Sequence, residues 1–100
     1  MKGMTINEFL EKVYYGDELE FKIGEMTYFI QGYRDEGIRY ITVDYWLKDD
    51  GTEPPHGYLF KKGYKTNEEV LKEFETLRIF NGKTIFEVEK DIDVIFGWFE

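Results

Sequence analysis

The spacing of the apolar residues in this chain changes at residue 18, from the three- and four-residue intervals of a helix to alternation with polar residues. Before the change, residues 6–14 have the pattern of one helical face, the capping pattern Thr-x-x-Glu begins at Thr5, and Gly16 is a natural helix end. After it, alternation typical of strands with one buried face runs through residues 18–23, 26–33 and 38–47, with turn residues between them. We therefore predict an N-terminal helix followed by a three-stranded antiparallel meander.

The next part of the chain predicts a loop, a fourth strand and a second helix. Residues 48–57 cannot pair regularly because Pro54 and Pro55 have no amide hydrogen. Residues 58–60 could add a fourth strand at the sheet edge, where the lysines that follow would discourage further pairing. A second Thr-x-x-Glu pattern begins at Thr66, and the apolar residues after it have helical spacing, which predicts a second helix.

Residues 79–92 contain two conflicting signals. Asn81 and Gly82 between apolar residues are typical of a hairpin turn. A third Thr-x-x-Glu pattern at Thr84, followed by apolar residues at helical spacing, favours a helix instead. We predict a short third helix and keep the hairpin as the alternative. The apolar tail, residues 94–99, must dock on the sheet, add a strand or meet a partner.

These elements predict one α+β domain over residues 1–100. Its fold would be an antiparallel meander of three to four strands, with an N-terminal helix and one or two C-terminal helices packed on one face. A length of 100 residues is typical of a single domain. Nine Phe, eight Tyr and two Trp supply much of the apolar content, so a few large rings can fill the core and others should remain at the surface.

The residue inventory and the net charge disfavour several classes of function. The chain has no Ser, Cys or Ala, so the commonest nucleophiles are missing, and the commonest general base is present only once, as His56. A net charge of −8 disfavours direct binding to nucleic acid or to an anionic membrane, because both need clustered Lys and Arg. His56 and its acidic neighbours lack the spacing of a metal site, and we expect no cofactor. Neither a signal segment nor a membrane-length apolar run is present, which predicts a cytoplasmic protein.

Acidic and aromatic residues are the candidate binding surface. If the acids converge on one face, they would present carboxylates to a basic groove as a nucleic-acid backbone presents phosphates; the alternative is a merely solvated exterior. Asp44 is an acid in the middle of a predicted strand. If its face of the sheet is covered, it would need a partner such as Arg39 or Arg34; if its face is open, it is an ordinary surface acid, and this alternative is favoured. The predicted partner-binding residues are Asp35, Glu36, Asp44, Trp46, Asp49, Asp50 and Trp98.

Four segments have the pattern of a strand, a turn or a helix start: Glu18-Leu19-Glu20-Phe21, Tyr28-Phe29-Ile30-Gln31-Gly32-Tyr33, Phe80-Asn81-Gly82-Lys83-Thr84 and Glu87-Val88-Glu89. In these segments the chain resembles short proteins of unassigned role from Gram-positive bacteria and their mobile elements. Because the shared motifs are structural, the resemblance implies a bacterial or phage setting and a small α+β domain but no functional residue.

Size, acidity, abundant rings and missing catalytic groups favour a non-catalytic protein-binding domain. One form of this hypothesis is a phage-type inhibitor, an anti-CRISPR protein or nucleic-acid mimic, that binds a basic nucleic-acid-handling enzyme such as a CRISPR nuclease. A second hypothesis is a homodimer or larger homo-oligomer that buries the tail, residues 94–99. A third, from a different class, is a small-molecule enzyme that uses carboxylates or tyrosines.

Overall fold

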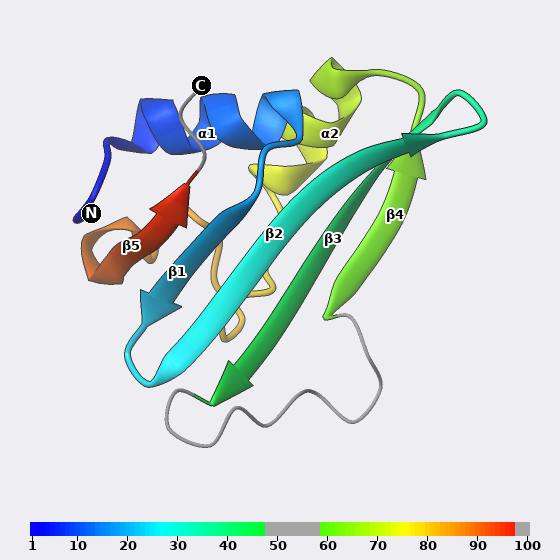
Figure 1. The fold of residues 1–100 in the computed structure, drawn as a ribbon. Helices are drawn as coiled ribbons and strands as arrows, with labels where there is room; N and C mark the ends of the chain where they lie inside the picture. Colours follow the sequence, from blue (N-terminus) through cyan, green and yellow to red (C-terminus); the bar gives the residue numbers. More distant parts are fainter. Residues whose placement is uncertain (48–58, 98–100) are drawn as a thin grey trace.

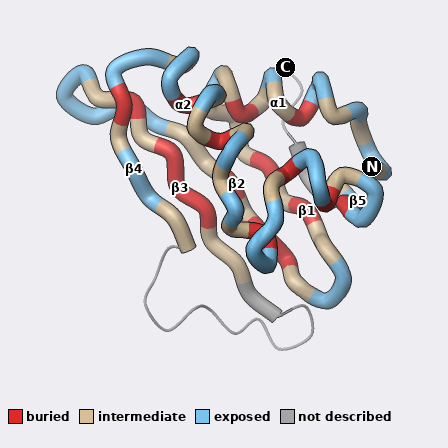
Figure 2. The backbone as a smooth tube through the Cα atoms, turned by 180° about the vertical axis from the view of Figure 1, so that it is seen from behind, coloured by how far each residue is buried: buried red, intermediate tan, exposed pale blue. Residues whose placement is uncertain are grey.

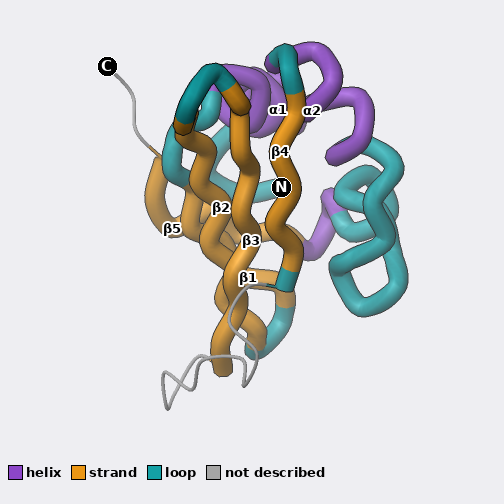
Figure 3. Tube along the Cα trace, turned by 90° about the vertical axis from the view of Figure 1, so that its right-hand side faces the viewer, coloured by secondary structure: helices purple, strands orange, loops and turns teal. Residues whose placement is uncertain are grey.

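The computed structural model describes residues 1–47 and 59–97, which form two layers (Figure 1). One layer is a five-stranded antiparallel sheet, and both α-helices lie on one side of it (Figure 3). The predicted α+β class is confirmed. The elements are, in chain order, α1 (Ile6–Tyr15), β1 (Leu19–Ile23), β2 (Met26–Asp35), β3 (Ile38–Leu47), β4 (Phe60–Tyr64), α2 (Asn67–Phe74), the 3-10 helix η1 (Glu89–Asp91) and β5 (Ile92–Gly97).

The first helix, α1, begins and ends where the sequence predicts. The Glu8 amide donates to the Thr5 hydroxyl oxygen at 3.2 Å, and the Thr5 amide donates to the Glu8 carboxylate at 3.0 Å, which completes the capping box. Gly16 ends the helix in the left-handed conformation, with φ of 79°. Phe9 and Val13, one turn apart on the same face, are buried.

The meander of β1, β2 and β3 is also confirmed, and alternation decides which residues enter the core. In the row Leu19, Ile30 and Val43, each residue pairs with the next across the sheet, and all three are buried. Figure 2 shows buried stretches along the strands and on both helices. The core therefore lies between the sheet and the helices, with Phe9, Phe21, Phe74 and Phe80 among its largest fully buried side chains.

The second helix, α2, is confirmed, but the fourth strand differs from its prediction. β4 spans Phe60–Tyr64 rather than residues 58–60, so two of the lysines expected to end the pairing lie inside the strand; Tyr58 is outside the described residues. An edge strand accepts charged residues because one side of it faces solvent. Lys62 also turns towards α2, where its amine lies 3.1 Å from the Glu73 carboxylate. The sheet order β4-β3-β2-β1-β5 places β4 at the edge, as predicted.

The predicted third α-helix is wrong, although both local signals in residues 79–92 are present. Asn81 and Gly82 have φ of 58° and 79° and form a tight turn between Phe80 and Lys83, whose backbones are hydrogen-bonded to each other. The third capping box also forms, with Glu87 and Thr84 bonded at 3.0 and 3.3 Å. It is followed only by turns and by η1, because from Ile92 onward the chain is extended and pairs with β1.

The apolar tail adds a strand, which is one of the three outcomes the sequence left open. β5 joins the sheet beside β1, at the opposite edge from β4, and the pairing has a bulge at Glu20 and Phe21. Lys2 lies on the other side of β5: its amide donates to Ile92 and its carbonyl accepts from the Val94 amide, both at 2.9 Å. The N-terminal segment therefore covers part of this sheet edge.

The capping boxes at Thr5 and Thr84 predict how the stability of the fold depends on pH. Hydrogen bonds from Thr5 and Thr84 lower the pKa of Glu8 and Glu87 below 4.5. A lowered carboxyl pKa gives stability that is present above the unfolded-state value and is lost as the pH falls through the folded-state value. We expect the urea midpoint to be flat from neutral pH to about pH 5 and to decrease below about pH 4.5. Glu8→Gln should reduce this decrease.

The matched control for this pH prediction is Glu11→Gln, an exposed acid on α1 that accepts no side-chain hydrogen bond from any described residue. Its urea midpoint should depend on pH as that of the original chain does. A Glu8→Gln variant with an unaltered pH profile would contradict the assignment of acid sensitivity to the cap.

Candidate functional site

The sheet has one face covered by the helices and one face that no described helix covers (Figure 3). Since successive side chains of a strand point to opposite faces, register decides which residues share the open face. Glu20, Phe29 and Asp44 form one row across β1, β2 and β3, because Phe29 pairs with both Glu20 and Asp44. Asp93 pairs with Lys22 in the next row. We call this surface the open face. Its residues are Glu20, Lys22, Phe29, Gln31, Tyr33, Asp35, Tyr40, Thr42, Asp44, Lys61 and Asp93.

Two tyrosines supply the exposed aromatic surface of the open face. Tyr33 and Tyr40 are paired across β2 and β3, and their rings are stacked with centroids 5.2 Å apart and planes 16° apart. Tyr33 is 37% exposed and Tyr40 is half-buried. Rigid, partly exposed tyrosines are common anchors in protein interfaces, since their contact area costs little conformational entropy.

Two of the seven predicted partner-binding residues, Asp35 and Asp44, share the open face, but they do not form a single cluster. By register Asp35 and Asp44 lie on the open face, Glu36 is in the turn between β2 and β3, and the side chain of Trp46 is not among those that the structure describes. Asp35 pairs with Ile38 at one end of β3, and Asp44 is six residues further along, a separation of about 20 Å. Glu20 and Asp93, which are outside the seven predicted partner-binding residues, also lie on this face, Glu20 paired with Phe29 and Asp93 paired with Lys22. Asp49, Asp50 and Trp98 lie outside the described residues.

Arg39 is not a partner for Asp44, because it belongs to the opposite, covered face. It is 3% exposed and donates to the carbonyl oxygens of Val13 at 2.8 Å and Tyr14 at 3.4 Å, and to the Asn67 side chain at 3.1 Å. The register places Arg34 opposite Arg39 on the same covered side. Arg39 therefore caps the C-terminal end of α1, where the helix dipole favours a cation. A pair with Asp44 would have required Asp44 on the covered face, and the register places Asp44 on the open face, the alternative that the sequence favoured.

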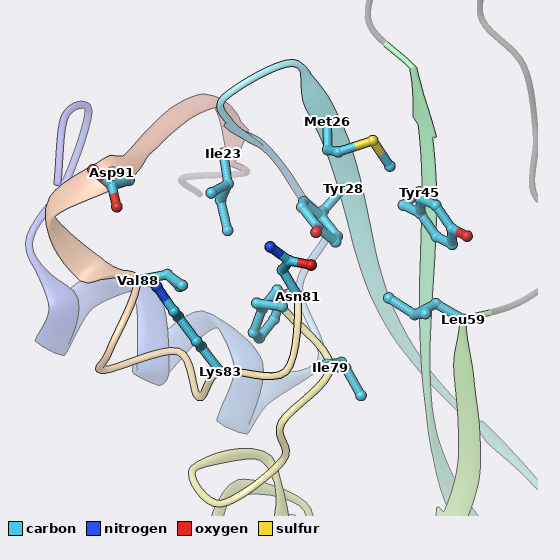
Figure 4. A pocket seen from close by; sticks show the side chains of 11 residues that line it. Ile23, Met26, Tyr28, Tyr45, Leu59, Ile79, Asn81, Lys83, Val88 and Asp91 are labelled. Carbon is cyan, nitrogen blue, oxygen red and sulfur yellow. The ribbon is translucent and has the colours of Figure 1, made fainter.

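A pocket of about 550 Å³ lies at the end of the covered face that the helices do not reach (Figure 4). It is formed by the adjacent ends of β1, β2 and β3, by the residue before β4, and by the turn and loop that lead to η1. Its volume is in the range of small-molecule sites. The lining residues are Ile23, Met26, Tyr28, Tyr45, Leu59, Ile79, Phe80, Asn81, Lys83, Val88 and Asp91.

The pocket combines an aromatic wall with a polar rim. Tyr28 lies between Tyr45 and Phe80, with ring centroids 6.2 and 5.2 Å away. Burial raises the pKa of the Tyr28 phenol, and the nearby Tyr45 raises it further, so the hydroxyl is protonated and can donate at neutral pH. The polar rim residues, Asn81, Lys83 and Asp91, are exposed. No pattern in the sequence predicted this pocket, although the Asn81–Gly82 turn, which supplies the lining residue Asn81, was predicted as the hairpin alternative.

Two further kinds of feature are absent from residues 1–47 and 59–97. No group of three or more His, Asp or Glu side chains in these ranges could hold a metal ion, and His56 lies outside them. No helix there is both long enough and apolar enough to cross a membrane.

No protein-family model matches the chain, and no curated protein or solved structure is significantly similar to it.

Proposed function

We propose that this chain is a non-catalytic protein-binding domain that docks a basic partner on its open face. The observation that carries the proposal is the composition of this face. It combines the stacked Tyr33 and Tyr40 with four acids, Glu20, Asp35, Asp44 and Asp93, against two lysines, Lys22 and Lys61. Aromatic anchors surrounded by charges of mainly one sign are typical of an interface with a partner of opposite charge.

The charge of the whole chain supports a basic partner. The net charge of −8 attracts basic surfaces at long range, and the acids of the open face would give short-range complementarity. Carboxylates spread over about 20 Å of a sheet, as Asp35 and Asp44 are, suit an elongated groove that otherwise binds phosphates. The partner we propose is accordingly a nucleic-acid-handling enzyme, such as a CRISPR nuclease, which this domain would inhibit by occupying the groove.

The features of the pocket favour binding over catalysis. Acid/base chemistry with carboxylates needs one carboxyl that is held protonated by burial or by a like charge. Asp91 is the one acid among the described residues that line the pocket, and it is exposed. A carboxylate enzyme is therefore the weaker hypothesis for this chain.

A double charge reversal on the open face tests the proposal. Asp35→Lys with Asp44→Lys should weaken binding to a partner captured from nuclease-treated bacterial lysate by about tenfold or more, because each substitution replaces attraction with repulsion. Binding should be measured with the purified partner at low and at high salt. The original chain should lose affinity as salt rises, and the variant should depend less on salt.

The matched control is Glu11→Lys with Glu75→Lys, which changes the net charge by the same amount on α1 and at the C-cap of α2. It should bind within about twofold of the original chain. Equal affinity of the two double variants would contradict docking on the open face.

Sedimentation at high concentration tests the second hypothesis, a homodimer formed through the apolar tail. Lys2 already occupies part of the β5 edge, so we expect a monomer.

A further inference from the structure

The pocket near residues 79–91 lies on the opposite face of the sheet from the proposed docking surface. Tyr28 and Tyr45, which line it, are paired to each other on the covered face, whereas their neighbours Phe29 and Asp44 are on the open face. A ligand in this pocket would not compete directly with a partner on the open face. The two sites can be tested separately.

The body of the pocket suits a flat apolar group. Aliphatic and thioether side chains from β1, β2 and the segments flanking β4 and α2 surround the aromatic wall, as Figure 4 shows. The tilted arrangement of Tyr28 and Tyr45, with 32° between their planes, presents ring faces and edges to a third ring. Met26 adds a polarizable sulfur, which packs well against aromatic groups.

The rim of the pocket carries one charge of each sign. Lys83 and Asp91 lie on the Val88 side of the pocket in Figure 4, and neither forms an ion pair with any residue that the structure describes. Asn81, on a neighbouring stretch of the rim, adds an amide that can donate and accept. A ligand with one charge would satisfy one of the two charged groups and be repelled by the other, whereas a zwitterion complements both.

The turn that carries part of this rim is fixed before any ligand binds. Phe80 and Lys83 exchange two backbone hydrogen bonds, of 3.2 and 3.1 Å, across Asn81 and Gly82. Phe80 is buried in the core and anchors the turn against Tyr28. A site on a rigid turn loses little entropy on binding.

From this arrangement we infer that the pocket binds a zwitterionic aromatic molecule of the free amino acid class. The aromatic ring would lie against Tyr28 and Tyr45, the carboxylate would face Lys83 and the ammonium would face Asp91. This inference does not depend on the proposed partner, since it uses different residues on a different face.

Four related probes test which parts of the ligand the pocket recognises: L-tryptophan, indole, tryptamine and indole-3-propionate. Amide chemical shifts of the isotope-labelled chain should be followed while each probe is added to millimolar concentration. L-Tryptophan should bind one to one, with the largest shifts at Ile23, Asn81 and Val88, which line the pocket. Tryptamine and indole-3-propionate, which each lack one charge, should bind about two- to fivefold more weakly, and indole more weakly still.

Two variants assign the charges. Lys83→Met and Asp91→Asn should each weaken tryptophan binding about two- to fivefold and leave indole unchanged, because exposed charge pairs contribute modestly. Lys90→Met, on η1 and outside the pocket lining, is the matched control and should bind tryptophan as the original chain does. Three results would overturn the inference: no shift at the pocket residues with any probe, equal affinity for indole and tryptophan, or equal binding by the two rim variants and the original chain.

Discussion

Phe21→Ala should lower the free energy of unfolding by about 4 kcal/mol. Phe21 of β1 is fully buried, and its ring packs against three other rings. The distances between ring centroids are 5.1 Å to Phe9 of α1, 5.4 Å to Tyr28 of β2 and 6.0 Å to Phe80 of the C-terminal segment. Alanine would remove these contacts and leave a cavity between the sheet and the helices. The hydrogen-bonded strands around this cavity cannot move far enough to fill it. Urea unfolding followed by circular dichroism measures the loss.

Phe86→Ala is the control for this prediction, because it removes the same atoms from a side chain that is 46% exposed. Its effect should stay below about 1 kcal/mol. Phe21→Leu, which keeps most of the volume, should cost about 1.5 kcal/mol. Similar losses for Phe21→Ala and Phe86→Ala would show that the core is not centred on Phe21.

The parts of the fold that depend on local patterns could be predicted from the sequence. The alternation of residues 18–47 placed Phe21 and Val43 on the buried side of a meander, and both are fully buried. Thr5 and Thr66 marked the starts of both α-helices, since a capping hydroxyl acts within one turn of chain. In these segments the local preferences and the tertiary structure agree.

The error at residues 79–92 came from a contact between distant parts of the chain. The turn at Asn81–Gly82 and the cap at Thr84 were both recognised, and both form. A third α-helix does not form because Ile92 pairs with Ile23 of β1, and this pairing requires extended backbone. No local pattern in this segment encodes that partner. The lysines of β4 are a similar case, because the contact of Lys62 with Glu73 depends on where α2 packs.

The candidate sites were predictable to different degrees. Strand alternation placed Asp44 on the opposite face from Val43, and the structure agrees. Alternation does not give the pairing between strands, so the separation of Asp35 from Asp44 is known only from the register of β2 and β3. The pocket could not be predicted at all. Its walls come from segments as distant in sequence as Met26 and Val88, and only the packing of the C-terminal segment on the sheet brings them together.

Arg39→Met should lower the free energy of unfolding by about 3 kcal/mol. The guanidinium of Arg39 is buried against Gly32 and Gly16, where an added Cβ on Gly32 would come within 2.4 Å of it and 2.6 Å of the Gly16 backbone. Methionine replaces the arginine side chain only as far as Nε and has no donors, so the carbonyls of Val13 and Tyr14 would lose their contact with the cation at the end of α1. Urea unfolding gives the size of the loss.

Arg34→Met separates this capping role from a general loss of charge. Arg34 lies opposite Arg39 in the sheet, is exposed, and makes one long hydrogen bond of 3.5 Å to Asn67. Removing it should change stability by less than about 1 kcal/mol, although the net charge changes by the same amount. Arg39→Lys should fall between the two, because a lysine amine cannot reach Asn67 and both carbonyls at once. If Arg34→Met and Arg39→Met were equally destabilising, the end of α1 would not depend on the buried arginine.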